Sequence, residues 1–337
     1  MTPGPRNALT DVSGIRVGHA QDMALLSGTT VVLPDESAVV AVDCRGGGPG
    51  TRETDALQPS TLVEVAHAIV FSGGSAHGLE AASGVSAWLN EQGRGFPVGQ
   101  GMVVPIVPAA ILFDLHNGGD KTRMGERTYF ELGKAAVAAG AEECPLGNVG
   151  AGTGAKCGSL KGGIGSASLV HESGWIVGAL AAVNAFGSAT LPGRPEFWAW
   201  PLERNGEFGN RPPPAPEAEL PLDYNFEGPF QELTNTTLAV VAVNAKLSRA
   251  QAQRLAIMAQ DGLARALRPV HTPFDGDTVF VLATGVQALS PKNPVADVAR
   301  LGQMAADCVA RAIARGVYEA KTLGRHPGYQ QTYPSSS

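Results

Sequence analysis

The sequence predicts a mixed fold in which β-sheets are covered by long helices on their outer faces. Three observations support this prediction. Short apolar runs rich in Val and Ile have the length of buried strands, longer segments show helical periodicity with capping residues, and glycine clusters separate many of these segments. Sheets with helices packed on their outer sides are the natural arrangement of such a set.

Composition narrows the class of protein. Of the 337 residues, 43 are Gly, about 13% against a usual value of roughly 7%. No three-residue glycine period is present and 44% of the residues are hydrophobic, which excludes a collagen and a disordered chain. A net charge of −6 argues against a nucleic-acid partner, and no apolar run is long enough to cross a bilayer. Without a signal-peptide pattern at its start, the chain is expected to be cytoplasmic and to have no membrane partner.

Six apolar runs are predicted to be strands. Two of them lead directly into glycine clusters, at 46–50 and at 73–74, where the backbone is expected to turn tightly or to approach another group closely. The runs cover residues 38–42, 68–71, 168–171, 175–183, 237–243 and 278–283.

Four segments are predicted to be helices, and each begins or ends with a capping signal. The signals are, in chain order, Ser75 at the start of a helix over 75–90, Gly140 after a helix over 126–139, the capping-box pair Ser248 and Gln251, and the pair Asn293 and Pro294.

The Pro-rich segment 211–221 has two interpretations. Its composition is that of a linker between two domains, and the length of the chain allows either one large domain or two ordinary ones. The chain after it soon enters the apolar run at 237, however, and a surface loop that leads into a central strand is the alternative.

Common enzyme motifs are absent from the sequence. The glycine-rich segment 73–78 lacks the G-x-S-x-G spacing because His77 occupies the last position, and the segment 158–163 is not a phosphate-binding loop. Neither the four Cys nor the seven His residues show the spacing of a metal site, so we expect no metal and no cofactor. Asp275 and Asp277 lie in a turn that enters the last predicted strand, and solvated turn carboxylates are the simplest interpretation.

The segment 235–244 combines a polar start with a buried-looking strand. It begins Asn235-Thr236-Thr237 and continues as an uninterrupted apolar run. Two Thr residues at the start of a strand are usually no more than β-formers, and the residues alone do not assign them a reaction.

In order along nearly the whole chain, the sequence resembles the P1 peptidases, which are peptidase family S58 and include L-aminopeptidase/D-esterases, β-aminopeptidases and nylon-oligomer hydrolases. The matching motifs are NALTDVSGIRVGH at 7–19, DCRGGGPGTRET at 43–54, SGGSAHGL at 72–79, GAGTGA at 150–155, KGGIG at 161–165, AVN at 182–184 and DGDT at 275–278. Each motif alone is weak, and their order makes the resemblance specific.

The resemblance implies an α+β fold, an αββα sandwich of the N-terminal-nucleophile-hydrolase type, and a precursor that cuts itself. The cut maps to the bond between Asn235 and Thr236, with Thr237 as the register alternative. A single hydrolase domain, 1–337, would then consist of an α chain, 1–235, and a β chain, 236–337. The segment 211–221 becomes the flexible approach to the cut bond.

The resemblance also implies the catalytic roles. Thr236 would be the nucleophile, and its new α-amine, with a reference pKa of about 7.7–8.0, the base. Lys161, or less favourably Lys156, would place a positive charge near that amine. The Asn184 amide would bind the oxyanion, a contribution on the order of 3 kcal/mol. Asp275 and Asp277 would orient the nucleophile, with both side chains on one face if their segment is extended.

One segment departs from the family pattern. No acid precedes Ile111 in the segment 105–114, and Phe113 stands where the nylon-oligomer hydrolases have Tyr. Asp114 remains as a candidate substrate-binding residue, and Gly73 and Gly74 would let the backbone approach the substrate. An amidase for small or oligomeric amides is therefore as plausible as an aminopeptidase.

Two other functions stay open at this point. A related fold belongs to the ornithine acetyltransferases, which also use a self-cleaved Thr, so the acyl group could be passed to an amine. A non-catalytic binding protein on the same scaffold is the third possibility. The partners implied by the resemblance are a small peptide or amide substrate and further copies of the chain, because relatives assemble as tetramers.

Overall fold

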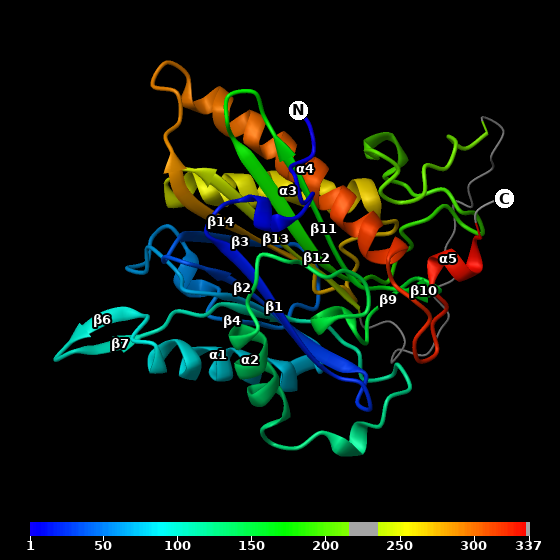
Figure 1. Ribbon diagram of the computed structural model, residues 1–337, viewed down its shortest axis with the longest axis horizontal. Helices are drawn as coiled ribbons and strands as arrows, with labels where there is room; N and C mark the ends of the chain where they lie inside the picture. Colours follow the sequence, from blue (N-terminus) through cyan, green and yellow to red (C-terminus); the bar gives the residue numbers. More distant parts are fainter. Residues whose placement is uncertain (216–234, 335–337) are drawn as a thin grey trace.

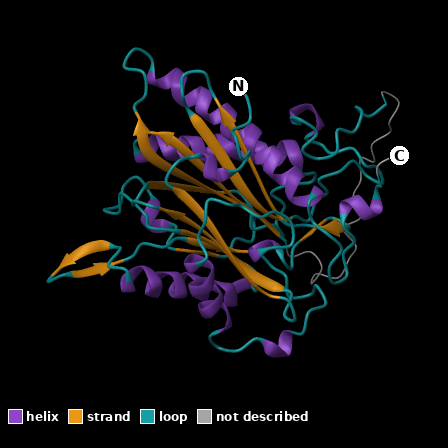
Figure 2. Ribbon diagram, in the orientation of Figure 1, coloured by secondary structure: helices purple, strands orange, loops and turns teal. Residues whose placement is uncertain are grey.

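Two five-stranded sheets lie face to face in the computed structural model, with helices on both outer faces (Figures 1 and 2). The structure describes residues 1–215 and 235–334. In the view of Figure 1, α3 (Arg249–Ala266) and α4 (Pro294–Tyr318) cover the upper sheet, and α1 (Glu80–Glu91) and α2 (Thr128–Ala138) lie below the lower one. The expected αββα sandwich is confirmed.

The upper sheet contains the strand that follows the Asn-Thr-Thr segment. Its strands run antiparallel to their neighbours except for one parallel pair at the centre, β13 with β14. In spatial order they are β11 (Ile164–Val170), β12 (Ile176–Asn184), β13 (Thr236–Ala245), β14 (Thr278–Gln287) and β3 (Val39–Cys44).

The lower sheet is built from the first half of the chain. In spatial order its strands are β1 (Ile15–Asp22), β2 (Ser27–Pro34), β5 (Ile69–Ser72), β8 (Ala109–Ile111) and β4 (Thr51–Arg52). Two small hairpins lie outside both sheets, formed by β6 (Phe96–Gly99) with β7 (Met102–Val104) and by β9 (Lys156–Cys157) with β10 (Leu160–Lys161). The short helices are η1 (Leu9–Asp11), η2 (Asp55–Leu57), η3 (Ser75–Leu79), η4 (Lys121–Arg123), η5 (Gly150–Gly152), η6 (Trp200–Leu202) and α5 (Tyr329–Thr332).

Strand alternation divides the core into layers. On β13, Leu238, Val240 and Ala242 belong to the apolar cluster between the two sheets, whereas Ala239 and Val241 belong to the cluster beneath α3 and α4. A third cluster joins the lower sheet to α1 and α2. Because successive side chains of a strand point to opposite faces, one strand contributes to both layers.

The sequence predictions of helix ends hold for two of the long helices. The Ser248 side chain accepts the Gln251 N–H in a capping box, and the Asn293 side chain accepts the Ala296 N–H before Pro294. Strands were expected at 168–171 and 175–183. β11 begins four residues earlier than expected and ends at Val170, and β12 runs from Ile176 to Asn184.

One predicted cap is wrong. Ser75 does not cap the helix that follows it, because η3 has Gly74 as its N-cap, no side-chain cap hydrogen bond is made there, and the α-helix begins only at Glu80. Ser75 instead adopts the left-handed conformation, with φ of 53°.

The Pro-rich segment 211–221 is described only as far as residue 215, and its remainder lies outside the described residues. Within the described part, the Arg211 side chain donates to the Tyr333 carbonyl oxygen over 2.6 Å. Among the described residues no helix is long and apolar enough to cross a membrane.

Candidate active site

Strand register separates the two Thr residues at the start of β13. Thr236 lies on the same face as Leu238, between the two sheets, and Thr237 lies on the face of Ala239, toward α3 and α4. Thr236 lines a cavity, and Thr237 does not. The two hydroxyl groups therefore lie in different environments although the residues are adjacent.

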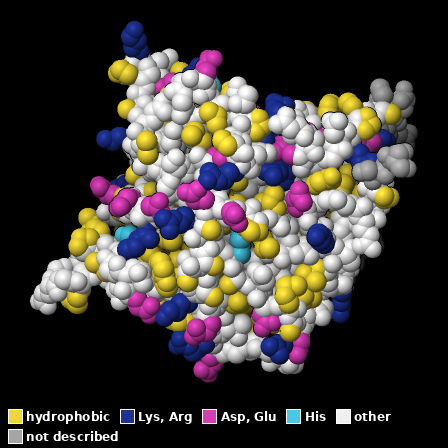
Figure 3. Space-filling model, viewed as in Figure 1, with side chains coloured by type: hydrophobic (Ala, Val, Ile, Leu, Met, Phe, Trp, Pro, Cys, Tyr) yellow, Lys and Arg dark blue, Asp and Glu magenta, His cyan; other side chains and the backbone are white. Residues whose placement is uncertain are grey.

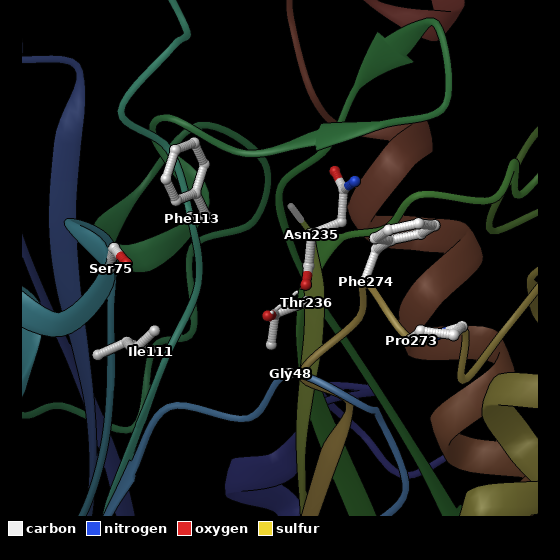
Figure 4. A pocket seen from close by; sticks show the side chains of 8 residues that line it. All are labelled: Gly48, Ser75, Ile111, Phe113, Asn235, Thr236, Pro273 and Phe274. Atoms are coloured by element: carbon white, nitrogen blue, oxygen red, sulfur yellow. Dashed lines mark hydrogen bonds between the residues drawn. The ribbon is translucent and has the colours of Figure 1, made fainter. Parts of the chain in front are cut away.

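The cavity has a volume of about 350 Å³. Figure 4 shows Ser75, Ile111 and Phe113 on one side of it and Asn235, Thr236, Phe274 and Pro273 on the other. The residues that line it are Gly48, Ser75, Ile111, Phe113, Asn235, Thr236, Pro273 and Phe274.

The peptide bond between Asn235 and Thr236 is held in a defined geometry. The Asn235 carbonyl oxygen accepts the Gly276 N–H over 3.0 Å and the Thr236 hydroxyl over 2.5 Å. The Asn235 N–H donates to the Phe274 carbonyl oxygen over 3.1 Å. A backbone N–H and a side-chain hydroxyl thus meet at the same carbonyl group.

The Asn235 side chain is buried, and its amide has no hydrogen-bond partner among the described residues. The residue is 2% exposed, and within 1–215 and 235–334 neither its amide oxygen nor its amide nitrogen is bonded. An unsatisfied buried amide costs about 1–3 kcal/mol. With no partner among the described residues, burial of the Asn235 amide is locally unfavourable.

Asn184 faces Thr236 across the β12–β13 ladder, where the two residues are Cα partners. Side chains of directly opposed residues in an antiparallel pair lie on the same face. The Asn184 amide oxygen accepts the Lys156 N–H over 3.0 Å, and its amide nitrogen donates to the Phe113 carbonyl oxygen over 3.1 Å. These two bonds fix the amide, whose NH₂ group carries a second donor hydrogen.

Asp277 fixes the backbone next to Thr236. One of its carboxylate oxygens accepts the Thr237 N–H over 2.8 Å, and the other accepts the His271 N–H over 3.1 Å and lies 2.9 Å from the His271 Nδ1. The residue is 1% exposed. Asp277 therefore acts on the strand backbone and not directly on the Thr236 hydroxyl.

Asp275 lies beside Asn235, with which it forms an isolated parallel bridge. Its carboxylate accepts the Thr272 N–H over 2.9 Å and the Thr272 hydroxyl over 2.6 Å. Burial, and then the neighbouring Asp277 charge, raise the pKa of Asp275. The two acids are two residues apart, both precede β14, and their carboxylates bond different groups.

Lys161 and Asp114 form a second group, outside the cavity lining. The Lys161 ammonium, 1% exposed, donates to the Gly152 and Gly162 carbonyl oxygens over 2.8 and 2.7 Å. Burial lowers the pKa of Lys161 to about 7, against the opposing effect of the Asp114 charge. The positive charge expected from Lys161 is thus largely present only below about pH 7. Lys156 is less buried and contacts Asn184 through its backbone.

Asp114 supports the glycine turn. Its carboxylate accepts the Gly74 N–H over 2.8 Å, and a Cβ on Gly73 would lie 2.1 Å from its Oδ2. Burial raises the pKa of Asp114. Gly73 is required by this close approach, and neither glycine is among the lining residues.

The structure brings Thr236, Asn235, Asn184 and Phe113 together and places Asp275 and Asp277 directly behind them. It adds Ser75, Gly48, Ile111, Pro273 and Phe274 to the candidate site. Gly48 and Ser75 lie in the motifs at 43–54 and 72–79, and Phe274 lies beside the motif at 275–278. The glycines of these motifs were the sequence features that could have indicated a site there. Nothing in the sequence indicated that Ile111 lines the cavity.

The αββα sandwich gives the chain the fold of the N-terminal-nucleophile-hydrolase type. Among solved structures, the chain is similar to a β-aminopeptidase from Burkholderia sp., with a TM-score of 0.72, 23% identity and coverage of 98% of this chain and 92% of that one. It is also similar to the L-aminopeptidase D-Ala-esterase/amidase from Ochrobactrum anthropi, described as a variant of the Ntn hydrolase fold, with a TM-score of 0.71, 19% identity and coverage of 96% and 88%.

The chain belongs to peptidase family S58, whose sequence model matches residues 7–330. An uncharacterized aminopeptidase of Mycobacterium tuberculosis (strain ATCC 25618 / H37Rv) is 46% identical over 98% of this chain and 99% of its own length. The 6-aminohexanoate-oligomer endohydrolase of Agromyces sp. (strain KY5R) is 28% identical over 81% of this chain and 74% of its own length. The expected family is confirmed, and the protein is an amide hydrolase of the aminopeptidase-like type.

Proposed function

We propose that this amide hydrolase is an N-terminal threonine hydrolase that cuts its own chain between Asn235 and Thr236. The observation that supports this most directly is the Asn235 carbonyl group, which faces both the Gly276 N–H and the Thr236 hydroxyl. A backbone donor at a carbonyl oxygen stabilises the negative charge that develops there when a nucleophile attacks.

Self-cleavage then follows in two steps. The Thr236 oxygen attacks the Asn235 carbonyl carbon, the C–N bond breaks, and the Thr236 nitrogen takes up the proton, which leaves an ester. Water hydrolyses this ester and releases the Asn235 carboxylate. The products are an α chain, 1–235, and a β chain, 236–337, that begins with a free amine and a hydroxyl on the same residue.

In the mature enzyme, the Thr236 amine accepts the hydroxyl proton as the oxygen attacks the substrate amide. Asn184, fixed opposite Thr236, donates its remaining amide hydrogen to the oxyanion. The leaving amine takes the proton, and water hydrolyses the acyl-enzyme. Asp277 holds the Thr237 N–H, and with it the position of the nucleophile.

We expect substrates to be small peptides, amino-acid amides or amide oligomers, in line with the names of the relatives. We also propose that the enzyme works in the cytoplasm as a homo-oligomer, a tetramer by resemblance to the family.

The variant Thr236→Ala tests the cut directly. Intact-mass analysis of the purified wild-type protein is expected to show two chains whose masses correspond to cleavage after Asn235. Thr236→Ala should remain one chain and be inactive, because the hydroxyl that attacks is gone.

The matched control is Thr237→Ala, which removes the neighbouring hydroxyl on the opposite face of the strand. It should still be cut after Asn235. Normal cleavage of Thr236→Ala, or loss of cleavage only in Thr237→Ala, would show that Thr236 is not the residue that attacks. A wild-type chain that stays whole would refute self-processing.

A further inference from the structure

Asn235 shows which part of a substrate the cavity accommodates. In the uncut chain, Asn235 is the acyl group that Thr236 attacks, and it lines the cavity together with Phe113 and Phe274. A substrate carbonyl must reach the same hydroxyl from the same side. Once the chain is cut and Asn235 moves away, the acyl group of a substrate takes its place.

The walls of this acyl pocket are uncharged. Among the described residues that line it, none is Asp, Glu, Lys, Arg or His, and most are apolar. No acid is among the described lining residues. Asp114 accepts the Gly74 N–H with one oxygen and has the other enclosed against Gly73, Asp275 accepts from Thr272, and Asp277 accepts from Thr237 and His271. An ammonium group placed here would lose its hydration without gaining a paired carboxylate, which is unfavourable.

Ser75 is the polar exception. Apart from Asn235 and Thr236, which form the cut bond, it is the only polar side chain among the described lining residues. Its hydroxyl makes no hydrogen bond within the described part of the chain and does not cap η3. Figure 4 shows Ser75 facing the side of the cavity that carries Thr236.

The backbone of Ser75 has a strained conformation. Its φ of 53° lies in the left-handed region that favours glycine, and two glycines precede it. The Ser75 N–H donates to the Leu112 carbonyl oxygen over 3.1 Å, and the Gly74 N–H to Asp114 over 2.8 Å. A strained non-glycine residue that is fixed at a cavity wall is typical of a functional site.

We propose that the mature enzyme prefers an uncharged acyl group in this pocket to one with a free α-ammonium, and that the Ser75 hydroxyl hydrogen-bonds a polar atom of that acyl group. The proposal rests on the proposed function, because it assigns the acyl side from the Thr236 reaction.

Three p-nitroanilides of one shape test the proposal on the mature wild-type enzyme. They are L-leucine p-nitroanilide, with a free ammonium, 4-methylpentanoic p-nitroanilide, without the amine, and 2-hydroxy-4-methylpentanoic p-nitroanilide, with a hydroxyl in its place. We expect kcat/KM to be at least roughly tenfold higher for the compound without the amine than for the leucine compound. The hydroxyl compound should be better still by roughly fivefold, the effect of one hydrogen bond.

Ser75→Ala and Ser75→Gly isolate the polar contact. Both should abolish the preference for the hydroxyl compound over the compound without the amine, largely through KM, so the ratio of the two kcat/KM values in each variant is the readout. Ser75→Gly relieves the left-handed strain that Ser75→Ala retains, so agreement between the two assigns the effect to the hydroxyl. Thr236→Ala provides the background rate.

The outcomes separate the two proposals. If the chain is not cut and Thr236 is not acylated, the proposed function fails. If the chain is cut but the leucine compound is the best substrate, or none of the three is hydrolysed, the uncharged acyl pocket is wrong. Equal losses for all three compounds in both Ser75 variants would overturn the role of the hydroxyl.

Discussion

Lys161 shows at the scale of a single residue how burial changes what a charge can do. Its ammonium is enclosed with two carbonyl oxygens as hydrogen-bond acceptors, and burial lowers its pKa to about 7. Near neutral pH this amine is close to half neutral. Because its pKa is close to neutral pH, Lys161 can gain or lose a proton during a reaction at that pH.

The lowered pKa predicts a pH-dependent stability. From about pH 7 to 10.5 the folded state has lost the Lys161 proton while the unfolded state, with a pKa near 10.5, still binds it. Since the unfolded state binds more protons, the free energy of unfolding rises with pH in this window by up to about 1.4 kcal/mol per pH unit. Below about pH 7 both states are protonated, and the full cost of burying the charge remains.

Urea unfolding of the uncut Thr236→Ala chain at pH 7.0, 7.75 and 8.5 measures this effect. The same chain with Lys161→Met should lack the contribution, so the difference in unfolding free energy between the two should move in favour of the Lys chain as pH rises. A difference that is independent of pH would show that Lys161 keeps its proton in the folded state.

The sequence indicates residue types better than residue environments. The resemblance located Thr236, Asn184 and the acid pair, but Asn235-Thr236-Thr237 alone cannot show which hydroxyl faces the space between the sheets. That depends on pairing with β12. Ser75 was expected to be a cap, because Ser before a helical pattern usually is. The structure instead gives Ser75 a left-handed backbone and no side-chain cap hydrogen bond.

At the scale of elements, glycine brings the layers into contact. A Cβ on Gly165 of β11 would lie 1.9 Å from the Ala312 carbonyl oxygen of α4, and one on Gly262 of α3 would lie 2.4 Å from the Ala306 carbonyl oxygen of α4. Gly133 of α2 makes a similar contact with α1, at 2.1 Å from the Ala81 carbonyl oxygen. Much of the glycine excess therefore serves close packing of helices, in addition to the turns at the cavity.

Gly165→Ala is expected to destabilise the protein by roughly 1–3 kcal/mol, because the added methyl group meets the backbone of α4 and forces the helix away from the sheet. Thermal unfolding of the variant in the Thr236→Ala chain measures the loss. Gly125→Ala is the control, since its Cβ would have no neighbour closer than 3.9 Å and its φ is ordinary. Equal stability of the two variants would contradict close packing at β11 and α4.

The central strands and the capped helices could be predicted from sequence, because uninterrupted apolar runs and cap residues are local signals. β1 and β2 were not predicted. β1 carries polar residues at several positions of a partly exposed strand, and β2 is buried on both faces, so neither shows simple alternation. β8, with three residues, is too short for any pattern and exists through its pairing with β5 and β4.

At the scale of the whole molecule, the proposed cut does not separate the two chains in space. The strands of 236–337, β13 and β14, lie inside the upper sheet between β12 and β3 of the first chain. Ladder hydrogen bonds on both sides and the shared core would hold the fragments together after cleavage. Self-processing of this kind opens one bond at the edge of the cavity and leaves the sandwich in place.

The β6–β7 hairpin is the part of the described surface that projects most clearly from the sandwich (Figure 1). Four large apolar side chains on it, Phe96, Val98, Met102 and Val104, are 42–56% exposed. Residues 95–113 include no Asp, Glu, Lys, Arg or His, whereas charges of both signs are interspersed over the face of the molecule in Figure 3. A two-stranded hairpin alone is marginally stable in water, and such a patch typically marks an interface.

We therefore expect this hairpin to contact a second copy of the chain in the homo-oligomer implied by the family resemblance. Light scattering coupled to size-exclusion chromatography should give a mass above that of one chain for the wild type. The double variant Val98→Asp, Met102→Asp should give a smaller species that is still cut after Asn235, because the hairpin does not line the cavity.

The control is the double variant Val286→Asp, Val295→Asp, which places the same two charges on other exposed apolar residues, 73% and 78% exposed, and should leave the mass unchanged. A wild type that is monomeric at micromolar concentration, or equal masses for the wild type and the hairpin variant, would rule the hairpin out as the interface.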